Sequence, residues 1–284
     1  MDSPEAAAAA VRAIGLAAAL LVAGRAFVRF WHRDHEAGEQ RGGHGPALGR
    51  IAIGAVLAFP FLGGAVLAGE WSGVLDPRMQ RLSWNSPSGA SAICCAVGLA
   101  LLAVGDATPV PRAARNIAGL AAVVGSFALA GHTLEGPVLL RPALVAHVSI
   151  AAFWIGGVAR LLSACRNEAS SEVARAGTHF SRVAGWLVPL LPVFGILLAT
   201  AHVKDWPSLA TGYGALLMGK LGVFVMLMGL AAHNRWRGVP RTAAGDASAR
   251  VRLRMVLRVE AALLCAVLAL TATMTSGLVS HPGE

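Results

Sequence analysis

The stretch Val183–Val203, VAGWLVPLLPVFGILLATAHV, contains no charged side chain in 21 positions. A helix rises about 1.5 Å per residue, so a run of this length crosses the roughly 30 Å of hydrocarbon in a bilayer. Five other uncharged runs have a similar length: Ile51–Gly69, Ser88–Gly105, Asn116–Leu134, Pro142–Ala159 and Ala261–Gly283. Two more, Ala6–Gly24 and Gly214–Asn234, each contain one cation, Arg12 and Lys220. The sequence therefore predicts an integral membrane protein with eight transmembrane helices.

The composition supports a single polytopic membrane domain over residues 1–284. Hydrophobic residues make up 56% of the chain and charged residues 14%, whereas a soluble domain carries about 25% charged residues. Backbone polar groups inside lipid must be paired within their own segment, so runs this long predict an all-α bundle. Pro60 and the pair Pro189 and Pro192 are expected to kink the second and sixth helices.

The basic residues predict how this bundle is oriented. Of the 24 lysines and arginines, 18 fall in the first, third, fifth and seventh gaps between the apolar runs. By the positive-inside rule these gaps face the cytoplasm, so both termini are expected outside. The net charge of +9 is then a topology signal from loops that face anionic lipid, and it requires no nucleic-acid partner. The N-terminus is acidic and lacks the basic region of a cleavable signal, so the first helix is expected to be retained.

Four of the nine histidines are predicted at the outer face of the membrane. His132 ends the fourth helix, His147 lies about five residues inside the fifth, His202 ends the sixth, and His281 follows the eighth. A histidine inside a span is costly and tends to face a bundle interior or a cavity, which makes His147 a functional candidate. The alternative for each is a packing role, in which the imidazole donates to a neighbouring carbonyl.

Two sulfur-containing residues lie below these histidines in the predicted topology. Met274 is near the outer end of the eighth helix, and Cys94 is in the outer half of the third. Imidazole binds copper, zinc and iron, whereas thioether and thiolate favour Cu(I). The sequence thus suggests a metal site for copper entering from outside, formed by six residues: His132, His147, His202, His281, Met274 and Cys94. Packing roles for the sulfur residues stay open.

Two charges are predicted inside the membrane, Lys220 and Glu260. They lie about 10–15 Å apart along the membrane normal, too far to form a pair. Lys220 is expected to meet Glu135 or Asp205, and Glu260 to meet Arg182 or Arg258. A structural role and a role in a transport path are both open for each. No catalytic constellation is present, so we expect a protein that is not an enzyme.

Several segments resemble one known family. They are Ala146–Gly157, which has the form His, six small or apolar residues, then Trp-x-Gly-Gly; Phe180–Ala184; Thr211–Lys220; Ala232–Arg237, with an Asn-Arg element; and Arg254–Ala261. Together they resemble the bacterial copper resistance protein D (CopD) family, most closely over Gly131–Pro282. The resemblance implies a protein of the bacterial inner membrane that moves copper from periplasm to cytoplasm, alongside a soluble periplasmic copper carrier. Trp154, within the first segment, joins Lys220 and Glu260 as a residue of the transport path or of the structural core.

Two other functions remain open from the sequence. Histidines at the same depth on neighbouring helices, His147 with His132 or His202, could be axial ligands of haem b in a membrane redox protein. In the other reading the protein is an accessory subunit whose histidines only pack.

Overall fold

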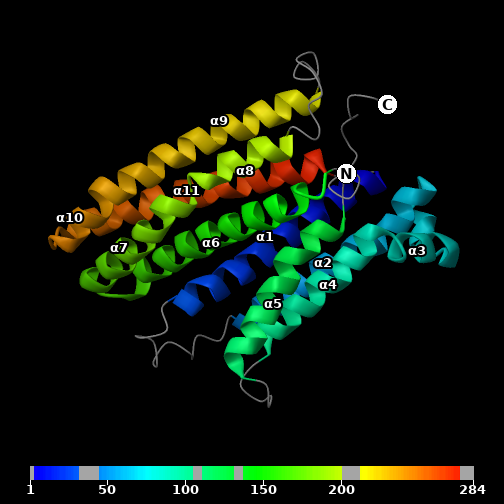
Figure 1. Cartoon of the computed structure of the whole chain (residues 1–284), viewed down its shortest axis with the longest axis horizontal. Coiled ribbons are helices and arrows are strands. Elements are labelled where there is room, and N and C mark those ends of the chain that lie inside the picture. Colours follow the sequence, from blue (N-terminus) through cyan, green and yellow to red (C-terminus); the bar gives the residue numbers. More distant parts are fainter. Residues whose placement is uncertain (1–2, 32–44, 105–110, 131–136, 200–211, 276–284) are drawn as a thin grey trace.

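The computed structural model describes residues 3–31, 45–104, 111–130, 137–199 and 212–275, and within these ranges every regular element is a helix. Figure 1 shows the arrangement of the elements. In chain order they are α1 Pro4–Trp31, α2 Gly45–Ala68, η2 Trp71–Val74, α3 Pro77–Trp84, α4 Pro87–Ala103, α5 Arg112–Ser126, η3 Phe127–Leu129, α6 Leu140–Asn167, α7 Ser170–Leu187, α8 Leu190–Ala199, α9 Gly212–His233, η6 Asn234–Gly238, α10 Val239–Ala243 and α11 Ala247–Met274.

Six helical segments are long and apolar enough to cross a membrane. They are Pro4–Arg29, Ala47–Ala68, Leu140–Asn167, Ser170–Ala199, Gly214–Ala243 and Ser248–Met274. The pair α3 and α4 is a seventh candidate, with a bend of 69° between its two helices. The chain is therefore a multi-pass membrane protein, as predicted.

The fourth predicted helix, Asn116–Leu134, is the one that differs. α5 has 15 residues and passes directly into the 3-10 turn η3, which ends at Leu129. Its apolar run was expected to continue to Leu134, but residues 131–136 lie outside the described residues. The prediction of eight helices is thus confirmed for six or seven, and the eighth crossing stays a prediction.

The bundle has two apolar cores, and α6 contributes to both. Val148 and Ala152 of α6 pack with residues of α1, α2, α4 and α5. Ile150, Trp154 and Val158, on another face of α6, pack with residues of α7 to α11. In Figure 1 the helices α1 to α5, blue to green, fill one side of the bundle and α7 to α11, green to red, the other. α6 lies between the two halves and packs against both.

Glycines set how closely α1 and α6 approach. A Cβ added to Gly24 would clash with the backbone of Ala152 and Gly156, and one added to Gly156 would clash with the backbone of Gly24. Lipid gives no hydrophobic force between helices, so close backbone contact of this kind is a main source of association in membranes. The two glycines thus hold α6 against α1.

The prolines act differently in the two helices where kinks were predicted. α7 ends at Leu187 and α8 begins at Leu190, so the helix is interrupted at Pro189. α2 continues through Pro60. There Ser83 Oγ donates to the Pro60 carbonyl at 2.6 Å and Gln80 Nε2 to the Phe61 carbonyl at 2.9 Å. The short helix α3 therefore lies over α2 and covers its carbonyl groups.

The cation inside the first helix has local partners. Arg12 Nη1 donates to the Thr275 carbonyl at 2.5 Å, and the guanidinium lies 4.9 Å from the centre of the Phe59 ring. A carbonyl acceptor and an aromatic face offset part of the cost of placing the charge in a membrane helix. Arg12 thereby ties α1 to α2 and to the residue that follows α11.

We predict that both termini face the periplasm. The start of α1 and the end of α11 lie at the same end of the bundle in Figure 1, as an even number of crossings requires, and the charge bias puts that end outside. Alkaline phosphatase fused to the C-terminus should be active, because it folds only in the periplasm. A fluorescent protein that matures only in the cytoplasm should stay dark there, and fluorescence from that fusion would contradict the orientation.

Candidate functional site

Glu260 on α11 is a buried carboxylate, 2% exposed, in the half of the bundle formed by α7 to α11. Its Oε1 accepts a hydrogen bond from Trp154 Nε1 at 2.7 Å, and its Oε2 accepts one from Asn234 Nδ2 at 2.9 Å. Trp154 is 2% exposed and Asn234 7%. Three segments distant in sequence, α6, η6 and α11, thus meet at one polar point, which we call the Glu260 cluster.

The cluster lies deep in the bundle. Glu260 is midway along the 28-residue helix α11, and Trp154 is midway along the 28-residue helix α6. Ionisable residues buried inside a membrane-protein bundle are rare and mark ion or substrate pathways. The Glu260 cluster is therefore the strongest candidate for a functional site within the described residues.

Local structure positions each member of the cluster. The Trp154 ring meets the Phe224 ring of α9 edge-on, at a centroid distance of 6.2 Å and an angle of 88°. Asn234 begins a π-helical turn, Asn234–Gly238, inserted between α9 and α10. Such turns widen a helix locally and occur frequently at functional sites. Here the turn brings the amide of Asn234 to α11.

Contacts link three segments of the sequence resemblance, Ala146–Gly157, Phe180–Ala184 and Ala232–Arg237. Phe180 of α7 lies against Gly157, where a Cβ would clash with its ring. Arg235 Nη1 donates to the Ser181 carbonyl at 2.6 Å and lies over Gly185, which joins η6 to α7. Residues quoted above as separate motifs are thus neighbours in space.

The partners of Glu260 differ from those expected. The sequence suggested Arg182 or Arg258, but the carboxylate takes two neutral donors, and no ion pair to it occurs within the described residues. Asn234 was missed as a site residue. The available signal was an amide at the end of an apolar run, next to Arg235. The expected partners of Lys220, Glu135 and Asp205, lie outside the described residues.

His147 makes a contact that orients its ring. Its Nδ1 lies 3.1 Å from the Leu191 carbonyl of α8, and a carbonyl can only accept, so Nδ1 is the protonated nitrogen. In the neutral ring, Nε2 then carries the lone pair. Metal-binding histidines in proteins commonly donate their other ring nitrogen to a carbonyl in this way.

The structure does not gather the predicted metal ligands into one cluster. Cys94 of α4 donates to the Ala122 carbonyl of α5 at 3.5 Å, in the N-terminal half. Met274 is buried at the end of α11. His132, His202 and His281 lie outside the described residues. In the part of the chain that the structure describes, no three His, Cys, Asp or Glu residues lie close enough to share a metal ion. The metal site stays a prediction.

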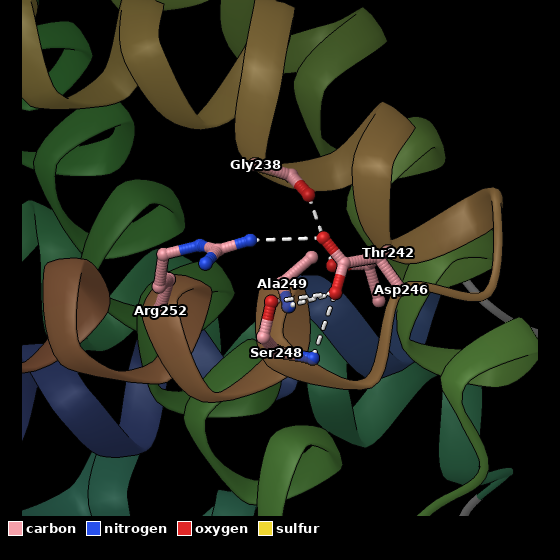
Figure 2. Close-up of polar contacts among 6 residues, drawn as sticks. All are labelled: Gly238, Thr242, Asp246, Ser248, Ala249 and Arg252. Atoms are coloured by element: carbon pink, nitrogen blue, oxygen red, sulfur yellow. Dashed lines mark hydrogen bonds and ion pairs between the residues drawn. The ribbon is translucent and has the colours of Figure 1, made fainter.

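The start of α11, which sets the position of Glu260, is fixed by Asp246 (Figure 2). Its Oδ1 accepts from the backbone nitrogens of Ser248 at 2.8 Å and Ala249 at 3.2 Å and from the Ser248 hydroxyl at 2.6 Å, and its Oδ2 accepts from Arg252 Nη2 at 2.8 Å. The hydroxyl of Ser248, more than any other group, lowers the pKa of Asp246 below its usual range, with help from the two backbone donors. This is an N-cap that is strongest when Asp246 is ionised.

Comparison with known proteins gives one family. Residues 174–274 match the family model of copper resistance protein D. The match covers about a third of the chain and confirms, over α7 to α11, the resemblance predicted from the sequence. Asn234, Glu260 and Met274 lie inside the matched segment, and Trp154 and His147 precede it. Searches of curated proteins and of solved structures each found no match. The family match supports a role in copper resistance.

Replacing Trp154 by Phe should destabilise the protein. The change keeps an aromatic ring but leaves one buried oxygen of Glu260 without a donor, which costs roughly 1–3 kcal/mol. Thermal unfolding in detergent should show a lower Tm. Trp236→Phe is the matched control, because Trp236 is 72% exposed. Equal Tm values for the two variants would show that the Trp154 hydrogen bond contributes nothing to stability.

Replacing Asp246 by Ala should lower the Tm by a few degrees at neutral pH, because helix α11 loses its N-cap. The folded-state pKa of Asp246 is lowered, so its stabilisation is complete above the ordinary aspartate pKa of about 4 and is lost as the pH falls through the lower folded-state value. The Tm difference between the parent and the variant should therefore shrink in acid. Asp246→Asn keeps an acceptor oxygen without the charge, so at neutral pH its Tm should fall less than that of Asp246→Ala. A difference independent of pH would contradict this role.

Proposed function

We propose that this protein transports copper across the bacterial inner membrane, from the periplasm to the cytoplasm. The observation that carries the proposal is that the segment matching the copper resistance family contains Asn234 and Glu260, two of the three residues of the Glu260 cluster. A buried polar cluster inside a membrane bundle is the kind of feature that ion pathways use. The direction of transport follows the sequence resemblance.

His147 is the proposed ligand that shares helix α6 with Trp154 of this cluster. Trp154 follows it by seven residues on α6, so both lie on one face of the helix, about 10 Å apart along its axis. The contact of Nδ1 with the Leu191 carbonyl leaves Nε2 to bind a metal ion. An ion held at His147 would thus be about two helical turns from the Glu260 cluster.

The remaining predicted ligands complete the proposed entrance. His132, His202 and His281 would supply imidazole at the outer surface, and Met274 a thioether at the end of α11. Cys94 would act from the other half of the bundle. Sulfur and imidazole donors favour Cu(I) over Zn²⁺ or Mn²⁺. A soluble periplasmic copper carrier is the proposed donor of the ion.

His147→Ala should abolish transport without affecting insertion. In proteoliposomes, uptake of Cu(I) should fall to the level of empty vesicles. The affinity of the detergent-solubilised protein for Cu(I) should fall by at least the roughly 10–100-fold that loss of a ligand's hydrogen-bond partner causes. His35→Ala is the control, since the sequence places His35 in a cytoplasmic loop. Excess Zn²⁺ should compete weakly.

The same purified protein tests the main alternative. An intense Soret absorption band that disappears in His147→Ala would identify the histidine as a haem ligand instead. Unchanged copper uptake by His147→Ala at equal protein level would return His147 to a packing role.

A further inference from the structure

We propose that Glu260 is a proton-binding site buried inside the helix bundle, with Asn234 as its partner in both protonation states. We further infer that proton release from Glu260 accompanies the passage of copper. The second inference depends on the proposed function, whereas the first depends only on the structure of the Glu260 cluster.

Within the described residues, no cation pairs with the carboxylate of Glu260. Both of its oxygens accept from neutral groups, the Trp154 indole and the Asn234 amide. An ionised carboxylate in an apolar interior is costly unless a cation compensates it. Binding a proton removes that cost, so the cluster is built to accept one.

The charged groups of the elements that pack against α11 are engaged elsewhere or lie apart from Glu260. Arg12 donates to the Thr275 carbonyl, Arg160 pairs with Glu168 at 2.5 Å, and Arg235 donates to the Ser181 carbonyl. Arg250 donates to the Glu168 carbonyl. None of the titratable or basic residues on these elements forms an ion pair or hydrogen bond with Glu260 within the described residues: Glu5, Arg12, Arg25 and Arg29 on α1, Arg141, His147, Arg160, Cys165 and Arg166 on α6, Lys220 and His233 on α9, Arg235 and Arg237 on η6, Arg241 on α10, and Arg250, Arg252, Arg254, Arg258 and Cys265 on α11.

The two donors differ in what they can do when Glu260 gains a proton. An indole nitrogen only donates, so Trp154 stays with Oε1 in either state. An amide has a donor and an acceptor. Asn234 Nδ2 donates to Oε2 when the carboxylate is ionised, and Asn234 Oδ1 can accept from Oε2 when that oxygen carries a proton. Rotation of the amide exchanges the two arrangements, so Oε2 is the oxygen that binds the proton.

A second observation supports this role for Asn234. Its Oδ1 is buried and has no hydrogen-bond partner in the arrangement that the structure shows. An unpaired buried oxygen costs roughly as much as a lost hydrogen bond. A protonated Glu260 would supply the missing donor. The residue also begins the π-helical turn Asn234–Gly238, where helix geometry is less constrained than in α9.

The proton exchanges with water, so the step balances without another reactant: the carboxylate and H₃O⁺ give the carboxylic acid and H₂O. A cation held at His147 is separated from Trp154 by about 10 Å along α6, and the low dielectric of the interior lets its field act over that distance. A positive charge there favours the ionised form of Glu260. Copper entry and proton release are thereby coupled.

Infrared difference spectroscopy of the full chain in nanodiscs tests the proton site without copper. At about pH 6, where water-exposed carboxylates are ionised, the protein should show the C=O band of a carboxylic acid. Glu260→Gln should remove the band, and the matched control Glu172→Gln should retain it, because Glu172 is an exposed residue paired with Arg175. Absence of the band from the parent, or its persistence in Glu260→Gln, would overturn the proposal.

A second variant decides the matter if Glu260→Gln does not fold. Trp154→Phe keeps the carboxyl group but removes the donor to Oε1, so the C=O band should shift to higher frequency. An unshifted band would assign the acid to another residue and overturn the proposal.

Proteoliposomes that contain a pH-sensitive dye test the coupling. Cu(I) uptake by the parent should release protons, and Glu260→Gln should abolish that release. Proton release that persists in Glu260→Gln would overturn the coupling. Absence of copper uptake by the parent would refute the proposed function, while the infrared band would still decide whether Glu260 binds a proton.

Discussion

A carboxylate in the middle of an apolar bundle must find its hydrogen-bond donors inside the protein, because the hydrocarbon offers none. Glu260 finds them on α6 and η6, at 2.7 and 2.9 Å. Leaving one oxygen unpaired would cost as much as several apolar contacts provide. The requirement therefore fixes the relative positions of α6, η6 and α11. Through the contact of Arg235 with the Ser181 carbonyl, it also constrains α7.

Close packing of helix backbones provides the second constraint. Gly24 and Gly156 bring α1 and α6 into contact, and Gly157 accommodates the Phe180 ring of α7. The two glycines of α6 are adjacent and face different neighbours, so this one helix turn is held from both sides. Trp154 lies two residues before Gly156 and is thus next to a closely packed part of α6. A polar cluster in such a place keeps its geometry, because its supporting helices have little freedom to shift.

The sequence predicted much of the fold, because hydropathy and length alone decide which segments enter the membrane. The crossing predicted over Asn116–Leu134 is not confirmed, because α5 tightens into a 3-10 turn at Phe127 although the apolar run continues. The sequence did not predict α3, because this helix is too short and too polar to stand out in a hydropathy pattern. Ser83 and Gln80 stabilise it by donating to carbonyls of α2. Trp154 and Glu260 were both singled out, but they are 106 positions apart, and opposite charge suggested arginine partners. Neutral donors are favoured over an arginine as partners of Glu260, because burying an arginine would require desolvating a second charge.

The helices needed to hold the Glu260 cluster together extend beyond the segment that matches the family. The match begins at residue 174, yet the Glu260 cluster is incomplete without Trp154 of α6. α6 in turn packs on α1 through Gly24, and Arg12 of α1 reaches the Thr275 carbonyl beyond the end of α11. α1 therefore contacts the two helices that carry Trp154 and Glu260. The N-terminal half, whose sequence resembles the family mainly in hydropathy, is in this way packed against both helices that carry the site.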